Sequence, residues 1–90
     1  MTRKFTPNSE WDDVEIGEAT GNGFRAVAKC ENGRFMVVSW NAHHRNWVRQ
    51  NRSRGGAIHR NLDVLRNDGL EGGPVYMSLY QARDEVGIDV

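Results

Sequence analysis

The chain has 90 residues and a formal net charge of +0, with 38% hydrophobic and 27% charged residues. This composition argues against a disordered chain, and the length predicts one small domain over residues 1–90. No apolar run approaches the roughly 18 residues of a membrane-spanning helix, and the first residues lack the apolar core of a signal peptide. We therefore expect a cytoplasmic protein without membrane contact.

The net charge hides an uneven distribution of charged residues. No acidic residue lies between Glu31 and Asp63. Histidines apart, the charged residues of that interval are all arginines, namely Arg34, Arg45, Arg49, Arg52, Arg54 and Arg60. Acids predominate before and after it, so a basic centre lies between two acidic ends.

At the start of the chain, residues 1–10 are expected to form an extended arm, because Pro7 and Asn8 break regular structure. Residues 11–19 are predicted to form the first strand, beginning at Trp11. A glycine-rich turn then leads into the most regular part of the sequence.

That part is the stretch Gly23–Trp40, in which Asn32-Gly33 separates two runs rich in β-branched and aromatic residues. Asn followed by Gly favours a two-residue type I′ turn, because both central residues need positive φ. A loop of that length would place Cys30 opposite Phe35 and fix the pairing of the two strands.

In this register the side chains alternate between two faces. The expected core face carries Phe24, Ala26, Ala28, Cys30, Phe35 and Val37, and the other face carries Arg25, Val27, Lys29, Met36, Val38 and Trp40. The second face is amphipathic, so we expect part of it to be covered. The predicted register would also set Arg25 opposite Trp40, within reach of a cation–π contact. The single Cys30 is interpreted as a buried core side chain.

Residues 41–54 allow two interpretations. In the first, residues 41–45 form a loop and residues 46–50 a fourth short strand. In the second, Asn41 caps a helix that runs to Arg54. That helix would carry a poor apolar stripe, so the loop and strand are favoured.

Two short helices are predicted in the last third of the chain. Residues 57–66 carry apolar side chains at i, i+4 and i+7. Ser78 with Gln81 forms a capping-box pattern that begins a second helix, which Gly87 ends. The expected fold class is α+β, with a small antiparallel sheet of three or four strands followed by two helices that cover one of its faces.

No catalytic, metal or cofactor site is expected. His43, His44 and His59 are the candidate metal ligands, but no cysteine or carboxylate lies at a supporting spacing. None of the glycine-rich pieces matches a phosphate-binding loop.

The expected binding residues are arginines and tryptophans. Arginine and tryptophan contact phosphates and bases in nucleic-acid complexes, and they also anchor protein–protein interfaces. Three alternatives stay open: pairing with the acidic ends of the same chain, contact with a protein partner, and contact with nucleic acid. The candidates are Arg25, Trp40, Arg45, Trp47, Arg49, Arg52, Arg54 and Arg60.

From these observations we expect a small non-enzymatic binding protein that docks on a protein or nucleoprotein partner and occludes a functional surface. Accessory proteins of phages and mobile elements, including inhibitors of nucleic-acid-handling host defence complexes, belong to this size class. The alternative function is direct nucleic-acid binding through the Arg- and Trp-rich central segment.

Overall fold

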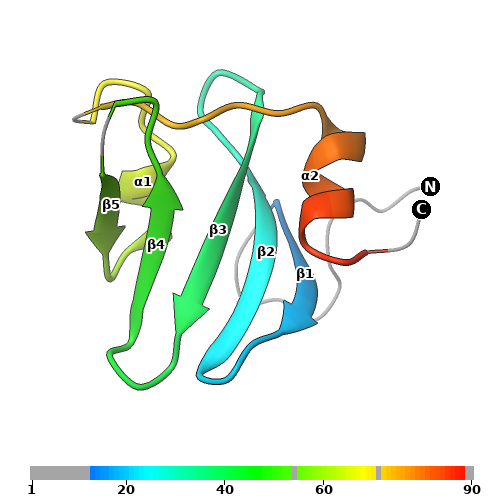
Figure 1. The fold of residues 1–90 in the computed structure, drawn as a ribbon. Helices are drawn as coiled ribbons and strands as arrows, with labels where there is room; N and C mark the ends of the chain where they lie inside the picture. The colour runs from blue at the N-terminus through cyan, green and yellow to red at the C-terminus, as the bar shows by residue number, and fades with distance from the viewer. Residues whose placement is uncertain (1–12, 54, 71, 89–90) are drawn as a thin grey trace.

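The structure, a computed structural model, describes residues 13–53, 55–70 and 72–88. It contains a five-stranded antiparallel sheet whose strands follow one another in chain order, and two short helices (Figure 1). The strands are β1 (Val14–Ala19), β2 (Gly23–Lys29), β3 (Phe35–Asn41), β4 (Asn46–Gln50) and β5 (Gly56–His59), and the helices are α1 (Leu62–Leu65) and α2 (Leu79–Glu85).

This arrangement confirms the α+β class and the antiparallel sheet, but the expected three or four strands are too few. The additional strand is β5, which occupies the start of the predicted helix over residues 57–66. Gly55, with a φ of 87°, helps to turn the chain back so that Gly56–His59 pairs with β4. The helix is shorter than predicted because Asn61 caps it, accepting a hydrogen bond from the backbone N–H of Asp63. The expected arm at residues 1–10 lies outside the described residues.

The hairpin between β2 and β3 is present, but its register is one residue away from the prediction. Lys29 lies opposite Phe35, and the connection is a three-residue loop closed by a 2.7 Å hydrogen bond from the Cys30 N–H to the Arg34 carbonyl. Gly33 has a φ of 88°, whereas Asn32 does not take a positive φ. The loop is therefore a turn followed by one left-handed residue, another common hairpin connection, and not the type I′ turn.

Because of this shift, the two faces differ from the predicted ones. Phe35 and Val37 lie on the second face, whereas Met36 and Val38 join the main core with Ala26. A slip of one residue moves each side chain of a strand to the opposite face, so only the β2 half of the predicted core face is correct.

The helices cover opposite faces of the sheet, not the same face as expected. Leu62 and Leu65 of α1 belong to the main core, whereas Ala82 of α2 and the following Val86 pack against Val27 on the second face. In Figure 1, α1 lies near β5 and α2 lies near β1 and β2. One helix thus packs on each face of the sheet.

Two further predictions are confirmed. The segment after β3 is a turn followed by a strand, as favoured over the helix. The Ser78 side chain accepts from the backbone N–H of Gln81, whose own side chain bonds back to the cap, so the capping box is complete. Gly87, with a φ of 80°, follows the end of α2.

We predict that Gly33→Val destabilises the fold by about 1–3 kcal/mol, because a β-branched residue is strained at positive φ. The space around Gly33 is open, so the cost comes from the backbone and not from a clash. Gly21 is also unobstructed but lacks a positive φ, so Gly21→Val is the matched control, with a change below about 0.5 kcal/mol. Urea unfolding of both variants measures the difference, and equal stability would contradict the hairpin assignment.

Candidate functional site

The tryptophans and central arginines that the structure describes do not form one exposed face. Trp47 and Arg49 are each only 1% exposed and lie in the main core. Trp40 is partly buried and packs against Trp47, with ring centroids 5.0 Å apart. These three residues therefore contribute mainly to the interior.

Arg49 is held in the core by two hydrogen bonds from its guanidinium. Its Nε donates to the Asn51 Oδ1 over 2.7 Å, and its Nη1 donates to the Leu65 carbonyl at the end of α1. The last carbonyls of a helix have no partner within the helix, so this contact satisfies one of them. Burial lowers the pKa of Arg49, with the nearby Cys30 and Tyr76 opposing the shift. The role of Arg49 in the structure is to join β4 to α1.

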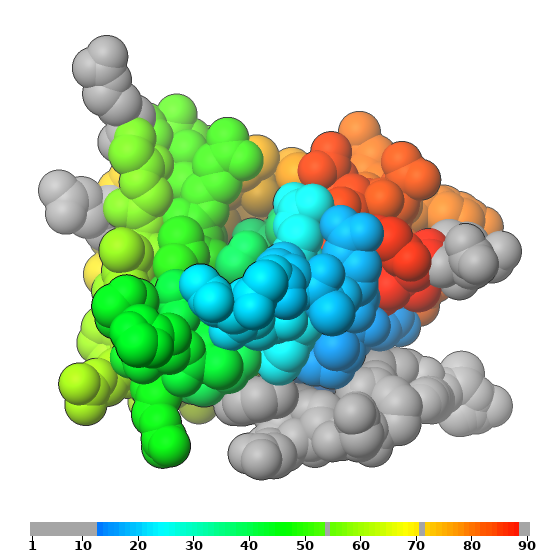
Figure 2. Space-filling view, turned by 60° about the horizontal axis from the view of Figure 1, so that its bottom comes forward, coloured from blue at the N-terminus to red at the C-terminus, as the bar shows by residue number. Residues whose placement is uncertain are grey.

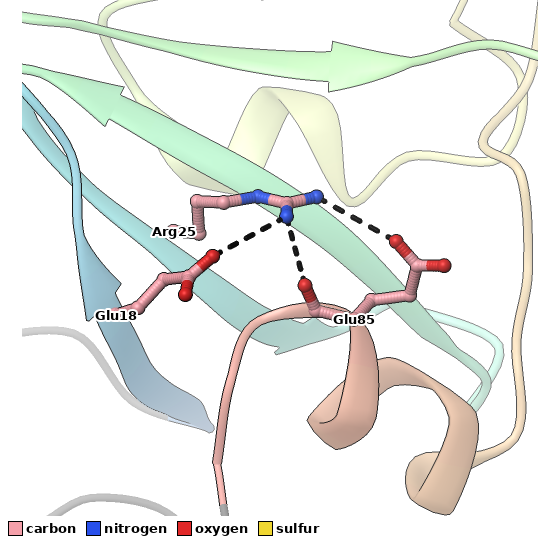
Figure 3. Close-up of polar contacts among 3 residues, drawn as sticks. All are labelled: Glu18, Arg25 and Glu85. Atoms are coloured by element: carbon pink, nitrogen blue, oxygen red, sulfur yellow. Dashed lines mark hydrogen bonds and ion pairs between the residues drawn. The ribbon is translucent and has the colours of Figure 1, made fainter.

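Arg25 lies on the second face, opposite Ser39 and not opposite Trp40, so the expected cation–π contact is absent. Its Nη1 donates to the Glu85 carbonyl over 2.8 Å, and its guanidinium lies 3.7 Å from both the Glu18 and the Glu85 carboxylates (Figure 3). All three side chains are partly exposed, so each ion pair contributes at most about 1 kcal/mol. Arg25 connects β1, β2 and the end of α2.

A second ion pair joins the same elements. The Arg83 guanidinium of α2 donates to both carboxylate oxygens of Glu15 in β1, over 2.6 and 3.0 Å. The hydrogen bond to Glu15 raises the pKa of Arg83, so the guanidinium stays charged. Among the described residues, pairing between the acidic ends and arginines thus involves Arg25, Arg66 and Arg83 and none of the arginines of the basic centre.

Four exposed arginines have a different environment. Within the described parts of the chain, none of them forms an ion pair with an acidic residue. We call them the unpaired arginines: Arg34, Arg45, Arg52 and Arg60. Arg54, the remaining candidate, lies outside the described residues.

The unpaired arginines divide between the two ends of the sheet. Arg45 lies in the β3–β4 turn, and Arg60 directly follows β5 at the same end, because Trp47 pairs with His59. Figure 2 shows this turn, in green, beside the yellow-green residues that end β5. His43 and His44 extend the polar surface of the turn. The structure therefore brings Arg45 and Arg60 together although fifteen positions separate them in the sequence.

Arg34 and Arg52 meet at the opposite end, around Tyr76. Their guanidinium carbons lie 5.3 and 6.0 Å from the Tyr76 ring centroid. The Tyr76 hydroxyl donates to Asp68 and accepts from the Asn32 side chain. Burial and the bond to Asp68 raise the pKa of Tyr76. Sequence reasoning missed Tyr76, since nothing in its local pattern shows that two arginines approach it.

The second face is only partly covered by α2, which packs on β2 and β3. Beside α2 lies a hollow of about 320 Å³ with an apolar floor that includes Val37 and Val48. In the described residues, no group of three or more His, Cys, Asp or Glu side chains is placed to hold a metal ion. No helix there is long and apolar enough to cross a membrane.

Cys30 lies in the main core, 4% exposed, as expected for a buried side chain. Burial raises the pKa of its thiol from 9.0 to about 11, and the positive charges of Arg49 and Arg66 oppose the shift only in part. A thiol with this pKa is protonated at neutral pH and is a poor nucleophile.

We predict that Arg49→Ala destabilises the fold by about 2–5 kcal/mol, because it leaves a cavity and removes the donor to the Leu65 carbonyl. Arg49→Met should cost less, since it fills most of the volume. Arg60→Ala, at an exposed position, is the control and should change stability by less than about 0.5 kcal/mol. Urea unfolding measures all three, and wild-type stability of Arg49→Ala would show that this side chain does not support the core.

We also predict that the free energy of unfolding falls as the pH rises from about 9 to about 11. In this interval the unfolded chain has released the Cys30 proton while the folded chain retains it, so alkali favours unfolding. Cys30→Ala should remove this part of the decline and leave any contribution of Tyr76. Urea unfolding at several pH values compares the slopes, and identical slopes would contradict the burial of the thiol.

Comparison of the chain with protein-family models, with curated proteins and with solved structures gave no match.

Proposed function

We propose that this chain is a small binding protein that docks on an acidic surface of a protein partner and covers it. The observation that carries the proposal is the set of unpaired arginines. An arginine that forms no ion pair is available for charge-assisted hydrogen bonds to carboxylates of another molecule. Arginine is also among the residues that contribute most to protein–protein binding energy.

The distribution of charge gives the molecule two different sides. Around β1 and α2, the acids Glu15, Glu18 and Glu85 are paired with arginines of the same chain. Around β4 and β5, the exposed arginines form no ion pair with a described acidic residue. Such an asymmetry orients the approach of an acidic partner and accelerates its association.

The same placement favours a protein over nucleic acid. The tryptophans that would stack on bases are packed into the molecule, Trp47 completely and Trp40 against it. Exposed Arg45 and Arg60 lie at one end of the sheet and Arg34 and Arg52 at the other, so they do not form one continuous track for a phosphate backbone. The overall pI of 6.8 is also far from that of a dedicated nucleic-acid-binding domain.

Docking would act by occlusion. The contact surface is built on a sheet that the hairpin and the Arg49 contacts hold in place, so little ordering is needed on binding. The mechanism requires no reaction at the partner, only that the covered surface is one that the partner uses.

We predict that Arg45→Asn/Arg60→Ala abolishes or strongly weakens partner binding without loss of stability. Asn is chosen at position 45 because Arg45 has a φ of 55°, which Asn tolerates. Lys29→Gln/Tyr80→Glu, on β2 and α2, is the matched control with the same change in net charge. Immobilised wild-type and variant proteins are used for capture, the retained protein is identified and purified, and its affinity is measured by calorimetry.

Equal affinity of wild type and the arginine variant for the purified partner would refute the proposal. Anisotropy with labelled single-stranded DNA, duplex DNA and RNA at several salt concentrations runs in parallel. Tight binding with a steep salt dependence, lost in the arginine variant, would replace the protein partner by nucleic acid.

A further inference from the structure

The outer edge of β5 is the least protected backbone in the sheet. β5 is the last strand in the order β1-β2-β3-β4-β5, and no described strand pairs with its outer side. Alternate residues of an edge strand direct their N–H and C=O groups away from the sheet. Such an edge is a template for pairing with another chain.

The opposite edge, at β1, is protected in three ways. Its pairing with β2 is irregular between Ile16 and Ala19. The end of α2 lies against it, because the Glu18 N–H donates to the Val86 carbonyl over 2.7 Å and a Cβ at Gly17 would collide with that same carbonyl. Two glutamates in β1 add charge. Bulges, charge and coverage are the means by which sheet edges avoid pairing.

Apart from its short length, β5 has none of these devices in the part of the chain that the structure describes. Its four residues, Gly56–His59, pair with β4 in unbroken register, and they include no proline and no acidic or basic residue apart from His59. At its centre Ile58 is 63% exposed, one of two large apolar side chains exposed to this extent among the described residues. An exposed apolar side chain in a regular edge strand indicates an interaction surface.

The surroundings of β5 suit an incoming strand. A hollow of about 340 Å³ runs along it, lined by Ala57, His59 and Leu70 among others, and it can receive a side chain from an added strand. Exposed arginines mark both ends of β5, Arg52 before it and Arg60 after it. Four residues of strand span only about 13 Å, so a short segment paired with β5 ends close to Arg60. Arg52 lies beyond the other end, with three residues between it and β5 and its guanidinium 6.0 Å from the Tyr76 ring centroid.

We propose that β5 binds an extended, acidic segment of the protein partner, which adds to the sheet as a sixth strand. This inference rests on the proposed function and specifies how the partner is held. Backbone hydrogen bonds to β5 would supply affinity, while alternate side chains and the terminal charges supply specificity. The segment carries acidic residues near both ends and apolar residues between them, one directed into the hollow and one beside Ile58.

A second copy of this chain is a poorer occupant. Antiparallel pairing of two β5 strands would bring Arg60 of each copy toward the beginning of the other strand, where Arg52 precedes it. Like charges facing each other oppose such a dimer. An acidic segment instead places a negative charge against each arginine.

The test uses displayed peptides, so that it does not depend on the natural partner. A library of random nonapeptides is selected on the full-length wild-type chain, with Ile58→Lys and Tyr80→Lys as comparison targets. Both substitutions introduce lysine at an exposed apolar position, since Tyr80 is 69% exposed, but only Ile58 lies on β5. Urea unfolding confirms that both variants are folded.

We expect acidic peptides with alternating apolar residues to be enriched on wild type and on Tyr80→Lys, and to bind Ile58→Lys about tenfold more weakly or worse. Selected peptides are then synthesised in two forms, N-methylated on alternate residues in either phase. An added strand uses the N–H groups of only one phase, so one form should lose about tenfold in affinity and the other little. The Arg52→Ala/Arg60→Ala variant should bind more weakly both to the unmodified peptides and to the N-methylated form that keeps its affinity for wild type.

Three outcomes would overturn strand addition: no enrichment over Ile58→Lys, equal tolerance of both N-methylated forms, or a dimer in sedimentation that Ile58→Lys dissociates. If peptides fail while the purified partner still binds in an arginine-dependent way, docking stands and strand addition is wrong. If peptides bind as expected but the partner is insensitive to the arginines, the proposed function is the part that fails.

Discussion

The buried guanidinium of Arg49 is the interaction on which the rest of the structure depends. It joins β4 to the last carbonyl of α1 through the interior of the main core, and it also binds Asn51, where the chain leaves β4. Removing an arginine from water is costly unless its donors are bonded. The core supplies acceptors for Nε and Nη1, whereas Nη2 is buried without a hydrogen-bond partner among the described residues. A four-residue helix has little stability of its own, and the Leu65 contact fixes its place on the sheet.

Burial of Arg49 also decides what the surface can do. One of the six central arginines is withdrawn from solvent, and Trp47 is withdrawn with it because both lie on the same face of β4. The positive charge left outside is carried by arginines at the two ends of the sheet, while Arg25 and Arg83 neutralise acids near β1. The two sides of the molecule differ in charge because Arg49 is buried in the core and because Arg25 and Arg83 pair with acids near β1.

Local signals in the sequence predicted the first four strands, the positive φ at Gly33 and the capping box at Ser78, because these depend on residues close to each other in the chain. The register was missed because Asn32-Gly33 is compatible with loops of two or three residues, and nothing local selects between them. The helix at 57–66 was overextended because the spacing of Ile58 and the two leucines also suits a strand, a turn and a short helix. The burial of Arg49 could have been predicted from the sequence, since residues 47 and 49 lie on the same face of a strand. The charge of the arginine side chain favoured an exposed position instead.

The one-residue difference in the hairpin has consequences as far as β5. Residues that lie opposite each other in an antiparallel pair point to the same face of the sheet. The face of Ala26 therefore sets that of Val38, which sets that of Arg49, which sets that of Ala57. Ile58 must then lie on the second face, beyond the reach of the seven-residue α2, which packs mainly on β2 and β3. The exposed apolar residue on the open edge is thus a direct result of the strand pairing, which is why we propose β5, and not the tryptophans, as the partner-binding element.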